Sequence, residues 1–350
     1  MTVSRQLKAF YKSFSQLGNG NSLIEIMPKD VALLIHISYF DIYDKAPKWF
    51  KPVFEDLAKV NFFDITPRMI ESLPSLTEED AIRLLQLSGA TNTENIIYLY
   101  LKNLSELYRR RFKFYNILRT QPFPATEQIG LRCLLEYGNC NDALLFSWMK
   151  WRKLIYDIDN RSAQETGYLF EPILASCLGG ESVLHTYSPV KRIDEKGRPT
   201  NEGRQIDCYI EERKEVYELK LRVTIAASGQ GRFSEEMSFP YEAKRAGLKP
   251  FLIVFDSTSS ALLDRLKEKY ISEGGSYAIG DDAWNVLTSR AGKEMGKYIL
   301  KYIKPPISKM EQTDDEIPTN IHLSVSREMI SVKNDSGHEY LIPRSIISES

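Results

Sequence analysis

Three ionisable side chains interrupt two otherwise apolar stretches in the middle of this 350-residue chain. Asp207 lies within residues 206–210, while Glu218 and Lys220 lie within residues 216–223. Both stretches are rich in aliphatic and aromatic residues, which favour β-strands. Because side chains alternate between the two faces of a strand, Glu218 and Lys220 share one face. An acid and a lysine two residues apart are common in proteins, so the strand context distinguishes this pair.

The segment between the two stretches, residues 211–214, is charged and short enough to form a hairpin loop. A hairpin with this loop pairs residue 210 with residue 215 and sets Asp207 opposite Glu218. Two opposed carboxylates repel one another, so a cation is expected between them. A hard divalent metal with oxygen ligands suits this geometry. The alternative interpretation is an edge hairpin with a solvated polar face.

The segments around the hairpin predict a defined order of elements. Apolar residues recur at helical spacing before Gly179 and Gly180, which end the first helix. The continuous apolar run over residues 251–255 is typical of a central parallel strand, so the helix before it completes a βαβ unit. The predicted segments are a helix over 162–178, a strand over 183–187, a polar loop over 194–204, the two hairpin strands, a helix over 234–246, a strand over 251–255, a helix near 259–272, a strand near 276–279 and a helix near 282–303.

This pattern resembles the PD-(D/E)xK nuclease superfamily, and most closely its type II restriction endonucleases. The resemblance rests on Asp207, Glu218 and Lys220, on their positions on the second and third strands, and on the order of elements. It covers roughly residues 160–280. It implies an α/β (α+β) fold with a restriction-endonuclease-like α-β-β-β-α-β core.

Two further positions can be compared with the family's pattern. Members often carry a glutamate on the first core helix, and Glu171 occupies the matching position here, with Glu165 as the alternative. The proline that usually precedes the aspartate is absent, because Ile206 stands before Asp207. That proline is often lost in the family, so its absence weakens the resemblance only slightly.

The resemblance implies Mg²⁺-dependent hydrolysis of phosphodiester bonds at a specific sequence in double-stranded DNA. Asp207, Glu218 and the backbone carbonyl of Leu219 would hold the metal. The metal would polarise the phosphate and lower the pKa of a bound water. Lys220 would orient that water or stabilise negative charge, and Glu171 would bind a second metal or reach the first through water.

Two other functions remain open at this point. One is a repair, recombination or transposition nuclease of the same fold. The other is a nuclease-like domain that binds DNA or a protein without cutting. The intact set of Asp207, Glu218 and Lys220 argues against the second alternative, because a degenerate domain has no reason to keep three buried charges.

Two segments carry side chains suited to contacting DNA. The loop over 224–233 directly follows the metal-binding strand, and Arg and Gln can each bridge two atoms of a purine. Residues 108–115 interleave basic and aromatic side chains. The alternatives are a flexible connection for the loop and a helix with a solvated basic face for 108–115. The DNA-binding candidates are Arg222, Ser228, Gln230, Arg232, Arg109, Arg110 and Arg111.

Composition narrows the class of protein. Lys and Arg total 46 against 47 Asp and Glu, a net charge of −1, which is not the footprint expected of a protein that coats nucleic acid indiscriminately. No apolar run approaches the ~20 residues of a membrane span, and the N-terminus lacks the apolar core of a signal peptide. The four cysteines include no close pair and are expected to be free thiols. We therefore expect a cytoplasmic protein, and the resemblance to type II restriction endonucleases implies a prokaryotic one.

Three regions are expected along the chain. Residues 1–155 form a helical region that serves as a DNA clasp, a dimerisation element or a scaffold; residues 156–304 form the nuclease core; residues 305–350 form a small strand and hairpin extension. One catalytic site cuts one strand, and the chain offers no second copy of the constellation. Cleavage of both strands therefore predicts a homodimer with two-fold symmetry, through residues 1–155 or the helix near 282–303.

Overall fold

The computed structural model describes most of the chain and groups it into two compact units, neither of them continuous in sequence. The described residues are 4–20, 23–194, 196–221, 230–257, 260–311 and 320–345, and the side chains of residues 230–232 and 311 are not among the described parts. The first unit contains residues 1–14, 27–105 and 167–311, and the second contains residues 15–26, 106–166 and 312–350. The fold is mixed α and β, as predicted.

The N-terminal part of the first unit is helical, in agreement with the sequence. Its helices are α1 (Arg5–Ser15), α2 (Pro28–Tyr43), α3 (Pro52–Ala58), α4 (Pro67–Glu71), α5 (Glu78–Ser88) and the beginning of α6 (Ile96–Thr120). The Thr77 hydroxyl accepts a hydrogen bond from the Asp80 amide at 3.2 Å, while Asp80 accepts one from the Thr77 amide at 3.0 Å. This reciprocal pair satisfies two backbone donors at the start of α5. Gly89 ends the helix with φ of 83°.

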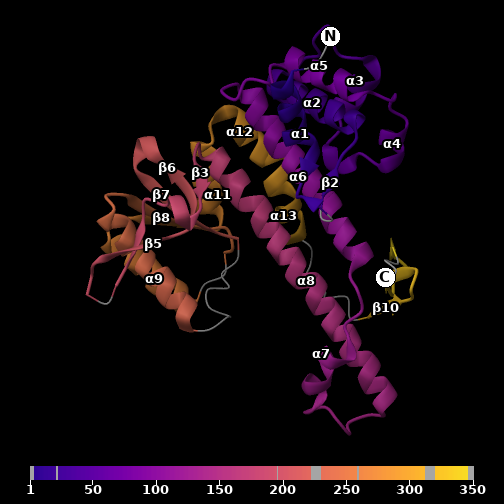
Figure 1. Ribbon diagram of the computed structural model, residues 1–350, viewed down its shortest axis with the longest axis vertical. Coiled ribbons are helices and arrows are strands. Elements are labelled where there is room, and N and C mark those ends of the chain that lie inside the picture. The colour runs from indigo at the N-terminus through magenta and orange to yellow at the C-terminus, as the bar shows by residue number, and fades with distance from the viewer. Residues whose placement is uncertain are drawn as a thin grey trace. The chain divides into compact units, whose positions relative to one another are not determined.

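A five-stranded sheet lies in the part of the first unit between residues 181 and 279, with the strand order β3-β6-β7-β8-β9. Its strands are β3 (Glu181–Val183), β6 (Ile206–Ile210), β7 (Glu215–Lys220), β8 (Lys249–Val254) and β9 (Ser276–Ile279), with α9 (Gln230–Arg245) and α10 (Ala261–Ser272) between the parallel strands (Figure 1). β6 is antiparallel to β7, and β7 is parallel to β8. The predicted βαβ unit is therefore confirmed. The pairing of Ile210 with Glu215 confirms the predicted hairpin register.

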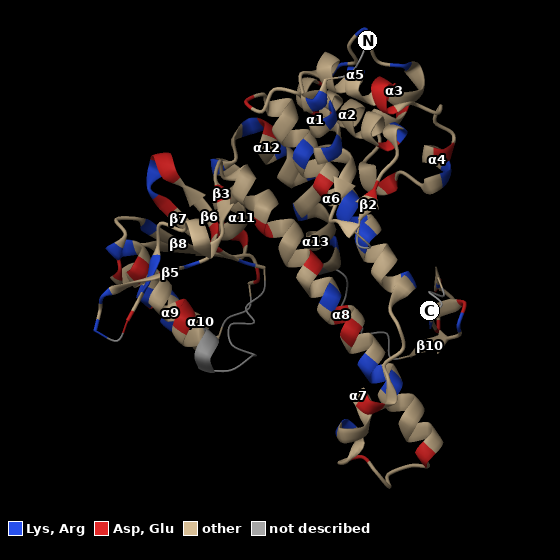
Figure 2. Cartoon of the chain, viewed as in Figure 1, with Lys and Arg blue, Asp and Glu red and all other residues tan. Residues whose placement is uncertain are grey.

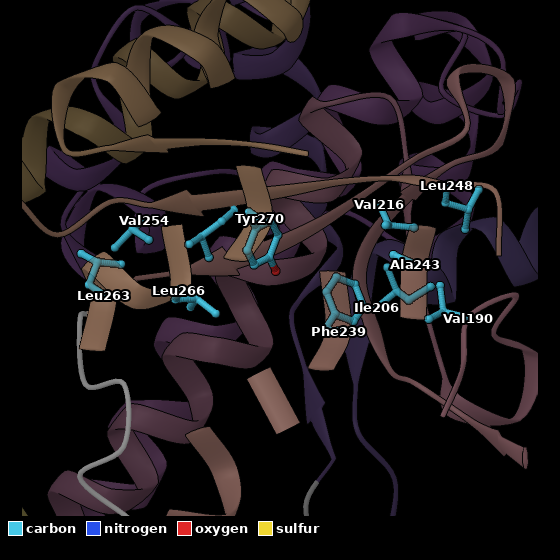
Figure 3. Packing of buried hydrophobic residues seen from close by; sticks show 11 residues of the cluster. Val190, Ile206, Val216, Phe239, Ala243, Leu248, Val254, Leu263, Leu266 and Tyr270 are labelled. Atoms are coloured by element: carbon cyan, nitrogen blue, oxygen red, sulfur yellow. The ribbon is translucent and has the colours of Figure 1, made fainter. Parts of the chain in front are cut away.

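One face of this sheet is covered by α9 and α10. Phe239 and Ala243 of α9 and Leu266 of α10 pack in one buried cluster with Val216 of β7 and Val254 of β8 (Figure 3). Burying side chains of this size stabilises the fold by roughly 1.5–3 kcal/mol each. Because Val216 faces this cluster, the alternation of β7 directs Glu218 and Lys220 toward the same face of the sheet.

The first half of the predicted core differs from the structure in two places. Residues 183–187 do not form a strand: β3 ends at Val183, and His185–Tyr187 form a 3-10 helix. Leu184 and Tyr187 are 60% and 80% exposed, so these two side chains do not pack in the core as residues of a half-buried strand would. The predicted polar loop over 194–204 is wrong as well, because β4 (Lys191–Ile193) and β5 (Pro199–Gly203) pair there as an antiparallel ribbon.

Two helices also have other limits than the sequence indicated. The helix predicted over 162–178 is the end of α8 (Asp142–Cys177), which continues through Pro172 and ends as expected before Gly179. The helix predicted over 282–303 is divided at Gly292, whose φ of 72° breaks the helical backbone. Its parts are α11 (Asp281–Arg290), α12 (Gly292–Tyr298) and a π-helix (Ile299–Ile303), and α13 (Lys304–Glu311) follows beyond the predicted end.

The second unit joins the end of α6, most of α8 and the C-terminal sheet. Its remaining elements are β1 (Gln16–Leu17), β2 (Ile24–Glu25), α7 (Thr126–Gly130), a 3-10 helix (Leu131–Cys133), β10 (Ile321–Val325), β11 (Met329–Asn334) and β12 (Glu339–Pro343). Leu118 of α6 packs against Ile330 and Ile342 of the three-stranded antiparallel sheet. The predicted small β-rich tail is thereby confirmed. The three-region division at residues 155 and 304 stays a prediction, and residue 155 falls inside α8.

Charge, cysteines and membrane spans agree with the composition. Acidic and basic side chains both occur along α8 and over the helices of the first unit (Figure 2). Cys133, Cys140, Cys177 and Cys208 are free thiols, as predicted. Within the described ranges, no helix has the length and hydropathy needed to cross a membrane.

Candidate active site

The hairpin of β6 and β7 brings the first three candidate residues together. Its register pairs Cys208 with Tyr217, and continuing that register by one residue sets Asp207 opposite Glu218. The backbone amide of Leu219 donates a hydrogen bond to Asp207 Oδ2 at 2.9 Å. This bond fixes the orientation of the Asp207 carboxyl beside the strand that carries Glu218 and Lys220. The expected juxtaposition is therefore present in the structure.

Negative charge is concentrated around Asp207. Burial raises the pKa of the Asp207 carboxyl well above its ordinary value, and the nearby charges of Glu218 and then Glu171 raise it further. The hydrogen bond from the Leu219 amide and the charge of Lys220 lower the pKa of Asp207, but their effect is smaller than the rise caused by burial and the two glutamates. Three acidic side chains thus influence one another within one buried region. Such a region favours the binding of a cation.

Lys220 is held between two carboxylates. Its Nζ lies 2.6 Å from Glu218 Oε1 and 3.2 Å from Glu236 Oε1. Burial by itself would lower the pKa of Lys220, but the charges of Glu218 and Glu236 outweigh burial and raise the pKa above its usual value. Lys220 is consequently an ammonium ion at neutral pH. As an ammonium ion it can stabilise negative charge and donate hydrogen bonds.

The two glutamates weighed for the first core helix have different surroundings. Glu171 of α8 is half-buried, and burial followed by the charge of Glu218 raises its pKa. The carboxylate of Glu165 instead forms ion pairs with Arg110 at 2.7 Å and Lys113 at 2.6 Å. Only Glu171 is electrostatically linked to the hairpin carboxylates, so it is the better match to the expected position.

The donor set of the hairpin fits a hard divalent metal. Asp207 and Glu218 supply carboxylate oxygens from opposed strand positions, and the carbonyl of Leu219 lies between Glu218 and Lys220 in the chain. Mg²⁺ is bound in proteins by one or two carboxylates and keeps several waters. In the described part of the chain, no three His, Cys, Asp or Glu side chains are arranged as a ready metal cage. The carboxylates of Asp207 and Glu218 therefore match the way in which Mg²⁺ is bound through one or two carboxylates and several waters.

The sequence-predicted DNA contacts lie in three kinds of surroundings. Arg222 and Ser228 lie outside the described residues, and Gln230 and Arg232 belong to the first turn of α9, where only the backbone is described. Arg109 is buried and donates to the carbonyl of Gln16 and to Glu106. Arg110 is paired with Glu106 and Glu165. Arg111 is the exposed member of the basic cluster.

Glu236 is a site residue that the sequence interpretation missed. It lies on α9, one and two helical turns before Phe239 and Ala243, which pack against the sheet. Residues three and seven apart share a helix face, so this spacing directs Glu236 toward the sheet as well. An acidic residue on the apolar face of the crossover helix was therefore a readable signal.

The order of strands, the hairpin register and the convergent carboxylates define a restriction-endonuclease type of protein. The chain belongs to the ApaLI-like restriction endonuclease family, whose model matches residues 65–304. A similar protein is the type II restriction enzyme ApaLI of Acetobacter pasteurianus, with 44% identity over 238 residues. The alignment covers 67% of this chain and 62% of that enzyme, so this chain matches slightly less than two thirds of its relative. No solved structure gives a significant match.

Proposed function

We propose that this protein is a type II restriction endonuclease that hydrolyses phosphodiester bonds at a specific sequence in double-stranded DNA. The observation that carries the proposal is the hydrogen bond from the Leu219 amide to the Asp207 carboxyl, which holds Asp207 beside the strand that carries Glu218 and Lys220. Membership of the ApaLI-like restriction endonuclease family supports it, because the matched residues include this hairpin. Action on DNA within a prokaryotic cell implies a cytoplasmic location.

The roles of the residues follow from their positions and charges. Asp207, Glu218 and the carbonyl of Leu219 would hold Mg²⁺, with Glu171 beside them. When bound, the metal would polarise the scissile phosphate and lower the pKa of water at the site. The Lys220 ammonium stabilises the negative charge that develops on the phosphate and orients the attacking water. The Leu219 amide keeps the Asp207 carboxyl in place through its 2.9 Å hydrogen bond.

Removing divalent metal is expected to stop cleavage. The substrate phosphate and the carboxylates of Asp207, Glu218 and Glu171 repel one another unless a cation lies between them. Plasmid DNA incubated with the protein and Mg²⁺ should be cut, and excess EDTA should abolish cutting. Ca²⁺ should support DNA binding with little cleavage, because its looser coordination positions water less well. Cleavage at full rate in excess EDTA would refute this mechanism.

We further propose that the active form is a homodimer. One Asp207, Glu218 and Lys220 set attacks one phosphate, so cleavage of both strands requires two chains related by two-fold symmetry. Leu131, Leu134 and Leu135 of the second unit are 91%, 76% and 92% exposed, and an apolar surface of this kind is typically buried against a partner.

Light scattering tests the homodimer directly. The protein bound to its recognition DNA should contribute about twice the 40.3 kDa chain mass. Replacing Leu131 and Leu135 together with Lys should lower the mass to that of one chain and leave only nicked circles. A monomeric wild-type protein that linearises plasmid DNA would contradict the dimer.

The same function gives the loop before α9 a role in recognition. We propose that Arg222, Ser228, Gln230 and Arg232 approach the bases beside the scissile phosphate, since this segment connects β7 directly to α9. Of the basic cluster on α6, Arg111 is the most exposed member, and we propose it for a phosphate contact.

A further inference from the structure

Glu236 occupies a position in the core that requires an explanation. Its Oε1 accepts a hydrogen bond from Lys220 Nζ at 3.2 Å. Its other oxygen, Oε2, is buried and has no hydrogen-bond partner among the described residues. Buried polar atoms in native proteins are nearly always hydrogen-bonded, and a charged one left unpaired is costly. The fold therefore places a carboxylate with one oxygen unpartnered among the described residues beside the lysine of the candidate active site.

A second glutamate of the same helix shows what a purely structural carboxylate looks like. Glu242 Oε2 is paired with Arg204, and its Oε1 accepts a hydrogen bond from the Ile193 amide at 3.1 Å. Both oxygens of Glu242 are thus engaged, and the side chain is fully buried. Glu236 differs, since it has one engaged oxygen and a lysine that it shares with Glu218. A buried, unsatisfied polar group in a native structure calls for a specific explanation, and a catalytic role is one of those recognised.

The sharing of Lys220 has a chemical consequence. Glu218 Oε1, the nearer partner of the lysine at 2.6 Å, is also an oxygen that a cation at the hairpin would attract. A lysine with Glu218 as its single partner would compete with that cation for the same carboxylate. Glu236 approaches the ammonium from α9, on the covered side of the sheet, and so offers it a second anion.

We propose that Glu236 is a positioning residue that holds the Lys220 ammonium at the reaction centre and leaves Glu218 available to the metal. The inference rests on the proposed nuclease function of the same hairpin. Glu236 does not touch the substrate in this assignment; it acts through Lys220. The raised pKa of Lys220, to which Glu236 contributes, agrees with such a role.

The experiment is a double-mutant cycle between Glu236 and Lys220. Glu236→Gln keeps the shape of the side chain and removes its charge, and Glu236→Asp restores the charge on a shorter stem. Glu235→Gln is the matched control, because Glu235 is the adjacent, exposed residue of α9. Single-turnover cleavage in saturating Mg²⁺ should slow roughly 10- to 100-fold in Glu236→Gln, the loss expected for one charged hydrogen bond. Glu236→Asp should recover part of the rate, and Glu235→Gln should match the wild type.

The cycle separates positioning from metal binding. In a Lys220→Ala background, Glu236→Gln should cause no further loss of rate, because the group that it positions is gone. The Ca²⁺ concentration needed for half-maximal DNA binding provides a readout independent of cleavage. It should rise in Glu236→Gln, where Lys220 is left with Glu218, and should not rise when Lys220 is also Ala. An equal rise in both backgrounds would make Glu236 a metal ligand and overturn the inference.

The outcomes also distinguish this inference from the proposed function. A wild-type protein that binds DNA with Ca²⁺ but never cuts it would refute the nuclease assignment, while the Ca²⁺ cycle would still report the coupling of Glu236 and Lys220. Wild-type rates in Glu236→Gln, with normal cleavage by the parent protein, would refute the positioning role alone. Loss of folding in Glu236→Gln with a folded, fully active Glu236→Asp supports a charge requirement, whereas unfolding of both variants would show that Glu236 is structural.

Discussion

Replacing Lys220 with Ala, or Glu218 with Gln, is expected to lower the rate of DNA cleavage by at least about a thousandfold. Both residues lie on one face of β7, with Lys220 Nζ 2.6 Å from Glu218 Oε1. Lys220→Ala removes the ammonium beside Glu218, which can offset charge developing on the phosphate, and Glu218→Gln removes a negatively charged metal ligand. DNA binding in Ca²⁺ should persist in Lys220→Ala. Single-turnover cleavage and fluorescence anisotropy measure the two effects separately.

The hairpin turn offers a control with the same sequence spacing. Glu212 and Lys214 are also an acid and a lysine two residues apart, but both are exposed at the end of the hairpin. Lys214 has φ of 52°, so Asn is the substitution that fits its backbone. The double variant Glu212→Gln and Lys214→Asn should cleave DNA like the wild type. If the Glu212 and Lys214 variant lost as much cleavage activity as the Glu218 and Lys220 variants, the hairpin would act through its overall charge.

Asp207→Asn separates catalysis from folding at the same site. The amide oxygen of Asn can still accept the hydrogen bond from Leu219, while a buried negative charge beside Glu218 and Glu171 disappears. Cleavage should be lost, and the melting temperature in EDTA should rise. Retained cleavage in Asp207→Asn would remove Asp207 from the reaction. Unfolding of the Asp207, Glu218 and Lys220 variants alike would make these residues structural.

The largest expected effect on stability comes from Glu242→Ala. Glu242 and Arg204 form an ion pair with both side chains buried, and Arg204 also donates to the carbonyl of Glu235 at 3.2 Å. Removing one partner leaves the other as an uncompensated buried charge, which costs about 3–5 kcal/mol. Urea denaturation should show this loss as a lower midpoint with little change in slope.

Two further variants define the reason for that loss. Lys244 lies on the same helix and forms an ion pair with Glu273, which follows α10. Because Lys244 is more than half exposed, Lys244→Ala should lower the free energy of unfolding by less than about 1 kcal/mol. Replacing Arg204 with Met and Glu242 with Leu together should restore most of the stability, since no buried charge is left alone. A cost for Glu242→Ala as small as that of Lys244→Ala would show that the pair is solvated.

The parts of the fold that were predicted correctly are those whose signal is local. The alternation of residues 206–210 and 216–220 determines which side chains share a face, and the four-residue turn fixes the register of Asp207 against Glu218. The apolar run of β8 needs burial on both faces, which defines a central strand. Local periodicity was therefore sufficient to assemble the hairpin and its neighbouring parallel strand.

The features that were missed depend on contacts between distant residues. The ribbon of β4 and β5 is polar and reads as a loop, but Glu242 of α9 binds both the Ile193 amide and Arg204 and so secures it. The predicted start of α8 at residue 162 was wrong for a similar reason, because the early turns of α8 are stabilised by packing such as that of Met149 on Ile129. Glu236 was overlooked because its partner, Lys220, is identified only once α9 is placed on the sheet.

Sequencing the ends of the DNA fragments released by the purified protein tests the proposed site-specific cleavage most directly. A mixture of plasmid and genomic DNA is incubated with the protein and Mg²⁺, with parallel reactions in EDTA and with the Lys220→Ala variant. Every end should map to one short recognition sequence, with both strands cut at fixed positions, and the two parallel reactions should release no ends. Ends scattered over unrelated sequences, or the same ends at undiminished yield from Lys220→Ala, would contradict a site-specific endonuclease that works through this hairpin.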